Sequence, residues 1–244
     1  MGLFDRFKGT KSQNAGPKTA ASKWADRIEK RAQNYDRQEA INALAEIANA
    51  EAASLLLKRF TFQIDPSITD QEERDAAFRG ILRAGMEAIE PVRAFAAKAE
   101  SLAWPMRIAK ELLSEDEYVA ELLRWLSKWD TEYAKFVDPK VQLLAALEEK
   151  RDPRIREQVE RFLGDVNEPA RFHAASTLLA QGDPEVVPAL VNLLLEEESV
   201  RVRTRVAEGL TARAWPLPAE TRDAARKALP SAFVLDSQGR VIKR

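Results

Sequence analysis

The sequence of 244 residues is rich in charged residues and poor in glycine and proline, which favours a helical protein. Hydrophobic residues make up 45% of the chain, enough for a continuous core. The absence of cysteine excludes disulfides, thiolate metal sites and a cysteine nucleophile. No apolar run approaches the ~18 residues of a membrane span, and residues 1–8 lack the apolar region of a signal peptide. We therefore expect a cytoplasmic protein.

The net charge of -1 conceals an uneven distribution. Residues 1–20 contain four basic and one acidic residue, and residues 199–244 contain ten basic and four acidic residues. The segment between them is therefore acidic. A basic end on an acidic body indicates an oriented molecule with an acidic partner at its C-terminal end.

The first seventeen residues are expected to be a flexible tail, because residues 9–17 have the composition of a polar linker. The extreme N-terminus combines three apolar and two basic side chains, namely Leu3, Phe4, Phe7, Arg6 and Lys8. Two interpretations stand: weak docking on a membrane or a protein, or an unattached terminus.

From about Lys18 onward the apolar spacing is helical almost without a break. We expect helices near residues 19–33, 36–49, 51–62, 70–84, 86–99, 102–113, 115–129, 138–149, 152–163, 167–180, 183–195, 199–213 and 217–229. Polar residues that can cap a helix stand at many of these starts: Asp36, Asp70, Asp138, Asp152, Asp183 and Ser199.

A helix-entry phrase recurs about every thirty residues. The copies over residues 167–178 and 199–210 share a polar first residue, Arg four residues later, Ala at the ninth position and Leu at the twelfth. The corresponding positions of successive second helices are Ala40, Arg74, Arg107, Gln142, Arg171 and Arg203. Their spacings of 34, 33, 35, 29 and 32 residues predict a degenerate repeat of antiparallel helix pairs.

The segment from Asp183 to Leu195, followed by Glu198-Ser-Val-Arg-Val-Arg203, resembles a HEAT repeat of the bacterial type that also occurs in phycobilin-lyase-like proteins. The resemblance implies an all-α fold, a right-handed α-solenoid whose second helices line the concave face. We expect about six antiparallel helix pairs over residues 18–230.

Residues 231–244 form a separate C-terminal element in this interpretation. Apolar runs flank the turn sequence Asp236-Ser-Gln-Gly239, which predicts a small β-hairpin. We expect it to pack on the last helix and cap the open end of the core, with a disordered tail as the alternative.

Two sets of arginines are candidate binding residues. Arg74, Arg107, Arg171 and Arg203 follow the repeat, so pairing with acidic residues of neighbouring turns is favoured over a stripe for acidic ligands. Three further arginines, Arg201, Arg205 and Arg213, exceed what the repeat needs. They are candidates for a partner-binding patch, and an ordinary solvated face is the alternative.

An aromatic concentration lies in the middle of the chain. It consists of Trp104, Tyr118, Trp125, Trp129 and Tyr133. Tryptophan beside basic residues is typical of an interaction hot spot, so the partner-binding candidates here are Arg124, Trp125, Lys128 and Trp129. Packing in an irregular core is the favoured alternative.

Catalytic and metal-binding patterns are weak. His173 is the single histidine, and a structural role is favoured for it. The acidic residues between Asp65 and Glu73 could hold a hard cation, but helix capping by Asp70 and Glu73 explains them more simply. No phosphate loop, nucleophile elbow or zinc motif occurs, so we expect no cofactor and no metal.

The sequence favours a non-catalytic cytoplasmic scaffold that binds another protein. The alternative is a DNA-binding protein of the same fold class, such as a HEAT-like alkylpurine DNA glycosylase, for which Arg124, Trp125, Trp129 and Asp130 would be candidates. A pI of about 6.1 and the acidic middle count against DNA. Neither the partner nor the oligomeric state follows from the sequence.

Overall fold

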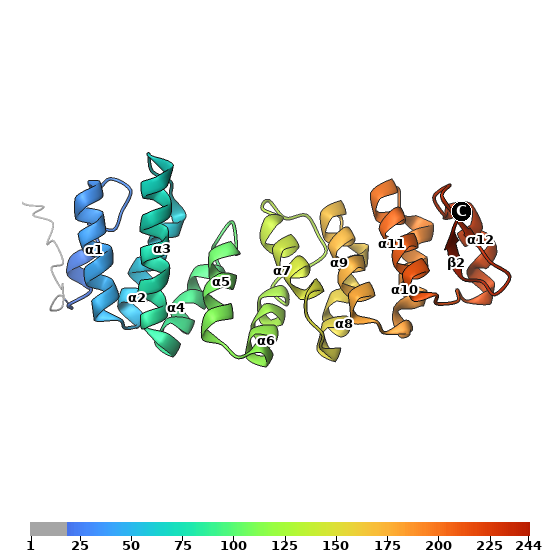
Figure 1. The fold of residues 1–244 in the computed structure, drawn as a ribbon, viewed down its shortest axis with the longest axis horizontal. Coiled ribbons are helices and arrows are strands. Elements are labelled where there is room, and N and C mark those ends of the chain that lie inside the picture. Colours follow the sequence, from blue (N-terminus) through green and yellow to red (C-terminus); the bar gives the residue numbers. More distant parts are fainter. Residues whose placement is uncertain (1–18) are drawn as a thin grey trace, which may run out of the picture. The chain divides into compact units, whose positions relative to one another are not determined.

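The structure, a computed structural model, describes residues 19–244 (Figure 1). The predicted tail over residues 1–17, with its docking segment around Leu3, Phe4 and Phe7, lies outside the described residues. The chain divides into two compact units between Pro91 and Val92. Each unit is described by itself, and a single array running across this division stays a prediction.

The first unit contains a short 3-10 turn followed by three α-helices. Its elements are η1 Ser22–Trp24, α1 Asn34–Ile47, α2 Ala50–Leu57, η2 Lys58–Thr61, α3 Ser67–Arg83 and η3 Gly85–Ala88. The helix expected over residues 19–33 was wrong, since this stretch consists of the 3-10 turn and further turns. Only Ala21 and Ile28 are buried between residues 19 and 33. Two buried side chains are too few to stabilise a helix by packing.

The second unit carries the remaining helices in the predicted order. After α4 Ile89–Ala96, which spans the division, come α5 Ala103–Leu112, α6 Glu115–Leu126, α7 Asp138–Glu148, α8 Pro153–Val159 with η4 Glu160–Gly164, α9 Glu168–Gln181, η5 Pro184–Val186 with α10 Val187–Glu196, α11 Val200–Arg213, η6 Ala219–Thr221 and α12 Arg222–Ala228.

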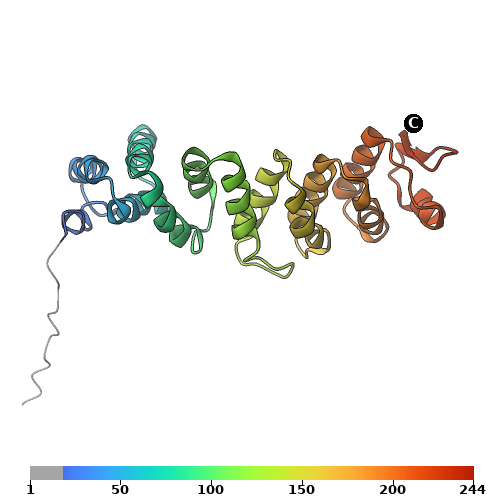
Figure 2. The same cartoon turned by 90° about the horizontal axis from the view of Figure 1, so that it is seen from below.

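Helices of the second unit lie in two layers (Figure 2). The second helices α7, α9 and α11 lie side by side, and the first helices are adjacent where η4 contacts α10 (Figure 1). Within a pair, α8 contacts α9 and α10 contacts α11. Each pair therefore stacks on its neighbour through both helices. The expected all-α repeat fold is confirmed, while the right-handed turn of a solenoid stays a prediction.

Small residues allow neighbouring second helices to approach closely. A Cβ on Gly209 of α11 would lie 2.2 Å from Leu179 Cδ1 of α9, which is far inside van der Waals contact. In the first unit, a Cβ on Gly80 of α3 would lie 2.9 Å from Ala45 Cβ of α1. Gly80 and Gly209 each stand six residues after an arginine of the predicted repeat. Close lateral packing is thus built into the same repeat position.

Three of the expected helix caps are present. Asp152 accepts a hydrogen bond from the Arg154 N–H, Asp183 from Glu185 N–H and Ser199 from Val202 N–H.

The other three, Asp36, Asp70 and Asp138, lie inside their helices, so their predicted capping role was wrong. Helix α3 begins at Ser67, which leaves Asp70 to accept hydrogen bonds from the Ile64 N–H and the Arg59 guanidinium. Burial tends to raise the pKa of Asp70, but these hydrogen bonds and the nearby arginine charges hold it below its ordinary value.

Buried ion pairs join successive helix pairs of the second unit. Lys140 Nζ lies 2.5 Å from Asp165 Oδ2, and both side chains are fully buried. Arg171 binds Glu197 through two hydrogen bonds of 2.6 and 2.8 Å. In both cases the cation lies in the first turn of a second helix, and the carboxylate lies in the turn that ends the following first helix.

These pairs correct the register of the predicted repeat. Lys140, and not Gln142, makes the contact that Arg171 makes one repeat later. The predicted alignment, which took Asp138 as the cap that precedes the helix, was two residues out: α7 begins at Asp138, and Lys140 is its third residue. Gln142 accepts a hydrogen bond of 2.6 Å from the Leu102 N–H instead.

A buried charge cluster also stabilises the first unit. Glu73 accepts hydrogen bonds from Arg37 of α1 at 2.7 Å and from Arg59 of η2 at 2.6 Å. All three side chains are at most 1% exposed. Because the carboxylate of Glu73 is engaged by two guanidinium groups, the predicted capping box of Asp70 and Glu73 was wrong.

The C-terminal hairpin is present as predicted. Strands β1 Phe233–Leu235 and β2 Val241–Lys243 pair antiparallel, with Val234 opposite Ile242. Asp236 fixes the turn by accepting hydrogen bonds from the N–H groups of Gln238 and Arg240. Strand β1 contacts α12 and β2 contacts α11, so the hairpin packs on the last helices.

The Lys140–Asp165 pair generates a first prediction. Asp165→Leu should lower the free energy of unfolding by about 3–5 kcal/mol, because it leaves the Lys140 ammonium buried without a counter-charge. Adding Lys140→Met should recover most of the loss. Urea unfolding followed by circular dichroism measures both. Asp223→Ala, which removes an exposed ion pair with Arg226, is the control. Equal losses for Asp165→Leu and Asp223→Ala would contradict the assignment.

The core generates a second prediction. Leu178 and Leu210 are 1% and 0% exposed and stand at the same repeat position. Leu178→Ala and Leu210→Ala should each destabilise the protein by roughly 2–5 kcal/mol through lost burial and a cavity. Val200→Ala, at a side chain that is 63% exposed, should change the stability by less than about 0.5 kcal/mol. Unchanged denaturant midpoints for both leucine variants would show that the helix faces are wrongly assigned.

Candidate functional site

The arginines predicted to bind a partner are engaged within the chain. The Arg201 guanidinium lies 2.9 Å from Glu168 and 3.7 Å above the centre of the Phe172 ring. Arg205 donates to Ser176 Oγ at 2.6 Å and to Glu148 at 3.2 Å. These contacts join α11 to α9 and α7, so an acidic partner would have to compete with them.

The third arginine of this patch has weaker ties. Arg213 is exposed, donates to the Ala180 carbonyl at 3.4 Å and lies over the Trp215 ring at 5.5 Å. Arg203, from the other predicted set, has a buried Nε without a hydrogen-bond partner in the described part of the chain. The structure thus brings Arg201, Arg205 and Arg213 of α11 into contact with α9.

The aromatic candidates separate into core and surface. Trp125 is 8% exposed and belongs to the core, and its Nε1 has no hydrogen-bond partner among residues 19–244. Its burial removes it from direct contact with a partner. Trp129 is half-buried, and its carbonyl accepts a hydrogen bond from Arg161 at 2.7 Å.

The two basic residues of that group are exposed. Arg124 lies 3.6 Å from Glu121 on the same helix, and Lys128 stands at the end of α6. Because Trp125 turns inward, Arg124, Lys128 and Trp129 do not form one patch around it.

His173 lies between the second helices. Its Nδ1 is 4.0 Å from Glu148 and its ring meets Phe172 edge to face. Burial lowers the pKa of His173 below its ordinary value, although Glu148 opposes the shift. A neutral, half-buried imidazole in this position fits the structural role predicted for it.

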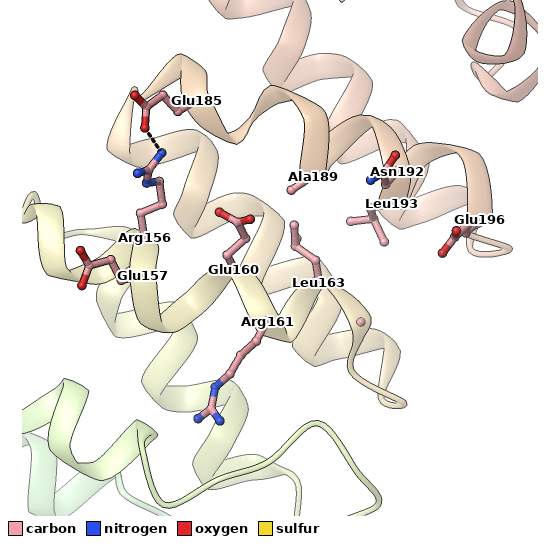
Figure 3. Close-up of a pocket in the computed structure, with 11 residues that line it drawn as sticks. Arg156, Glu157, Glu160, Arg161, Leu163, Glu185, Ala189, Asn192, Leu193 and Glu196 are labelled. Atoms are coloured by element: carbon pink, nitrogen blue, oxygen red, sulfur yellow. Dashed lines mark hydrogen bonds and ion pairs between the residues drawn. The ribbon is translucent and has the colours of Figure 1, made fainter. Parts of the chain in front are cut away.

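A groove lies between two first helices of the second unit. It runs between α8 with η4 on one side and η5 with α10 on the other, and its volume is about 840 Å³ (Figure 3). From η4, Glu160 and Leu163 point toward α10, whose Ala189 and Leu193 face them (Figure 3). We call this site the acidic groove, defined by Glu157, Glu160, Leu163, Ala189, Asn192, Leu193 and Glu196.

The two arginines beside the acidic groove already form ion pairs or hydrogen bonds within the chain. Arg156 lies 2.5 Å from Glu185 and 3.2 Å from Asp183, which closes one end of the groove (Figure 3). The hydrogen bond with Glu185 raises the pKa of Arg156. Arg161 points away from α10 and donates to the carbonyls of Leu126 and Trp129.

The remaining charges of the groove are acidic. Glu157, Glu160 and Glu196 are exposed and make no side-chain hydrogen bond or ion pair with any described residue. They stand on both walls, around a narrow apolar floor formed by Leu163 and Leu193. Such an arrangement favours a cation that brings an apolar side chain with it.

The sequence analysis did not predict this groove, because the repeat pattern singles out the arginines of the second helices. The available signal was the acidic middle of the chain, which includes Glu157, Glu160 and Glu196 on first helices. Nothing in the sequence showed that the arginines nearby would be neutralised or turned away.

Among residues 19–244, no cluster of three or more acidic, histidine or cysteine side chains could hold a metal ion. The described helices include none that is long and apolar enough to cross a bilayer.

The comparisons with known proteins concern the centre of the second unit. Residues 120–211 match the family model described as HEAT repeats, a range that begins in α6 and ends in α11. No curated protein matches the chain. The matched range contains the Lys140–Asp165 and Arg171–Glu197 pairs and the acidic groove. Residues 120–211 are therefore similar to HEAT repeats, and the stacked helix pairs of the second unit agree with that similarity.

Proposed function

We propose that this chain is a non-catalytic interaction module that binds a segment of another protein in the acidic groove. The observation that carries the proposal is the contrast between two surfaces. Arg201 and Arg205 on the second helices are engaged by neighbouring repeats, whereas Glu160 and Glu196 on the first helices are exposed and form no ion pair with any residue that the structure describes. Unsatisfied charge beside an open groove is available for recognition.

Binding of a protein fits the form of the groove. HEAT repeats stack into extended surfaces, and such surfaces serve protein recognition. We place this activity in the bacterial cytoplasm because the chain lacks cysteine and resembles bacterial HEAT repeats. A relation to phycobilin-lyase-like proteins stays a proposal, since the matched model describes HEAT repeats in general.

DNA binding and base excision are disfavoured by the arrangement of the candidate residues. Trp125 is buried, Arg124 lies beside Glu121, and Asp130 accepts a hydrogen bond from the Glu132 N–H. These side chains therefore do not converge on one accessible site. Carboxylates that line the groove would also repel phosphates.

The proposal is tested by photocrosslinking in cells. A photoreactive phenylalanine at Asn192, an exposed residue of the groove, should form a discrete adduct with one partner. The photoreactive phenylalanine placed at Glu208, which is exposed on α11, should form no adduct. Ala189→Trp in the Asn192 protein should abolish the adduct, because the indole fills the groove.

The comparison of Asn192 with Glu208 decides between the acidic groove and the arginine patch of α11. An adduct at Glu208 and none at Asn192 would favour the predicted arginine patch and an acidic partner, and would contradict the groove. Persistence of the Asn192 adduct with Ala189→Trp would show that the contact is outside the groove. Thermal unfolding of the Ala189→Trp protein establishes that it is folded.

A further inference from the structure

We infer that the acidic groove selects an amphipathic helix bearing lysine or arginine, and this inference rests on the proposed function above. Several chemistries could enter a groove on a HEAT repeat. The charges, the apolar floor and the shape of this one each restrict the choice.

The charged side chains that line the acidic groove favour a basic partner. Two cations line the groove, but Arg156 is held by Asp183 and Glu185. Arg161 is directed to backbone carbonyls on α6 and beyond it. Arg156 acts on Glu160 only as a nearby charge, and neither guanidinium forms an ion pair with Glu157, Glu160 or Glu196 in the described structure. Both guanidinium groups are engaged elsewhere, which disfavours an acidic ligand.

The carboxylates stand on opposite walls. Glu157 and Glu160 come from α8 and η4, and Glu196 comes from the end of α10. Glu160 points into the space between the walls (Figure 3). A ligand lying along the groove would meet negative charge on both flanks, so basic side chains on both of its sides would gain ion pairs.

The floor of the groove adds an apolar requirement. Leu163 and Leu193 are 8% and 7% exposed, and Ala189, one turn before Leu193 on α10, is small. This narrow strip accommodates one row of apolar side chains. Charge alone would hold a basic segment loosely, and the apolar row would fix its position.

The walls themselves favour a helical ligand. The groove lies between two helices, the geometry in which a third helix packs its ridge. Helix α10 has 10 residues, and a helix of that length spans about 15 Å at 1.5 Å per residue. A partner helix of roughly three turns, with leucines at i, i+4 and i+7 and basic residues beside them, matches this length.

Fluorescence anisotropy with a designed peptide tests the inference on the full chain. The probe is a labelled fourteen-residue helical peptide with leucines on one face and lysines flanking them. A second peptide keeps the leucines and replaces each lysine by glutamate. The lysine peptide should bind at low salt, the glutamate peptide should not, and binding should weaken as salt screens the exposed charges.

Two double variants locate the binding. Glu160→Gln with Glu196→Gln should weaken the lysine peptide by about fivefold or more, since two exposed ion pairs are lost. Glu149→Gln with Glu208→Gln removes the same charge at exposed positions outside the groove and should change the affinity by less than about twofold. Equal losses in the two variants, or equal binding of the two peptides, would overturn the inference.

Photocrosslinking separates this inference from the function on which it rests. If Asn192 crosslinks a partner and mass spectrometry shows that the attached segment is acidic or uncharged, the basic specificity is wrong and the binding function stands. If no adduct forms at Asn192, both are wrong. A crosslinked segment that carries lysines or arginines beside an apolar row supports both.

Discussion

The stacking of this protein depends on ion pairs buried between successive helix pairs. Asp165 and Glu197 each bind a cation from the preceding second helix and also accept the N–H that opens the next one, from Asn167 and Ser199. One carboxylate thus joins three segments. Burial raises the pKa of Glu197, but the hydrogen bonds from Arg171 and Ser199 outweigh it and keep the pKa below its ordinary value. Since an unpaired buried charge costs several kcal/mol, we infer that these pairs fix the register of stacking.

The use of charge in stacking determines which surface is free. Between the second helices, Glu148, Glu168 and Ser176 accept hydrogen bonds from arginines of α11, and that layer is largely satisfied within the chain. Between the first helices, η4 and α10 meet through apolar side chains such as Leu163 and Leu193, and Arg156 of α8 adds ion pairs with Asp183 and Glu185. Glu157, Glu160 and Glu196 beside this contact are exposed and form no ion pair with another described residue. The first helices therefore keep exposed carboxylates that a partner can reach.

The sequence predicted the features that repeat and missed those that depend on one local arrangement. The period, the helices from residue 34 onward, the caps at Asp183 and Ser199 and the hairpin all follow from spacing and turn chemistry. The stretch over residues 19–33 has helical spacing but too little burial. The inward turn of Trp125 and the direction of Arg161 are set by tertiary contacts. The acidic groove joins residues about thirty positions apart. No pattern along the chain indicates that Arg156 and Arg161 beside it already have partners within the chain.

The end of the array shows what happens where the repeated ion pair is missing. The carboxylates stand at positions 165 and 197, and the same spacing leads to Leu229, after which Pro230 and the hairpin follow. Arg203 is accordingly left with a buried Nε that has no partner in the described structure. Among residues 19–244, no further helix pair stacks on α11 and α12. Instead Phe233 and Val241, 6% and 1% exposed, cover the apolar core from the hairpin. Stacking inside the array combines apolar contact with a buried ion pair, whereas the hairpin combines apolar contact with the backbone hydrogen bond from the Leu217 N–H to the Gly239 carbonyl. This difference explains how a two-stranded hairpin, which supplies no carboxylate for Arg203, can take the place of another repeat.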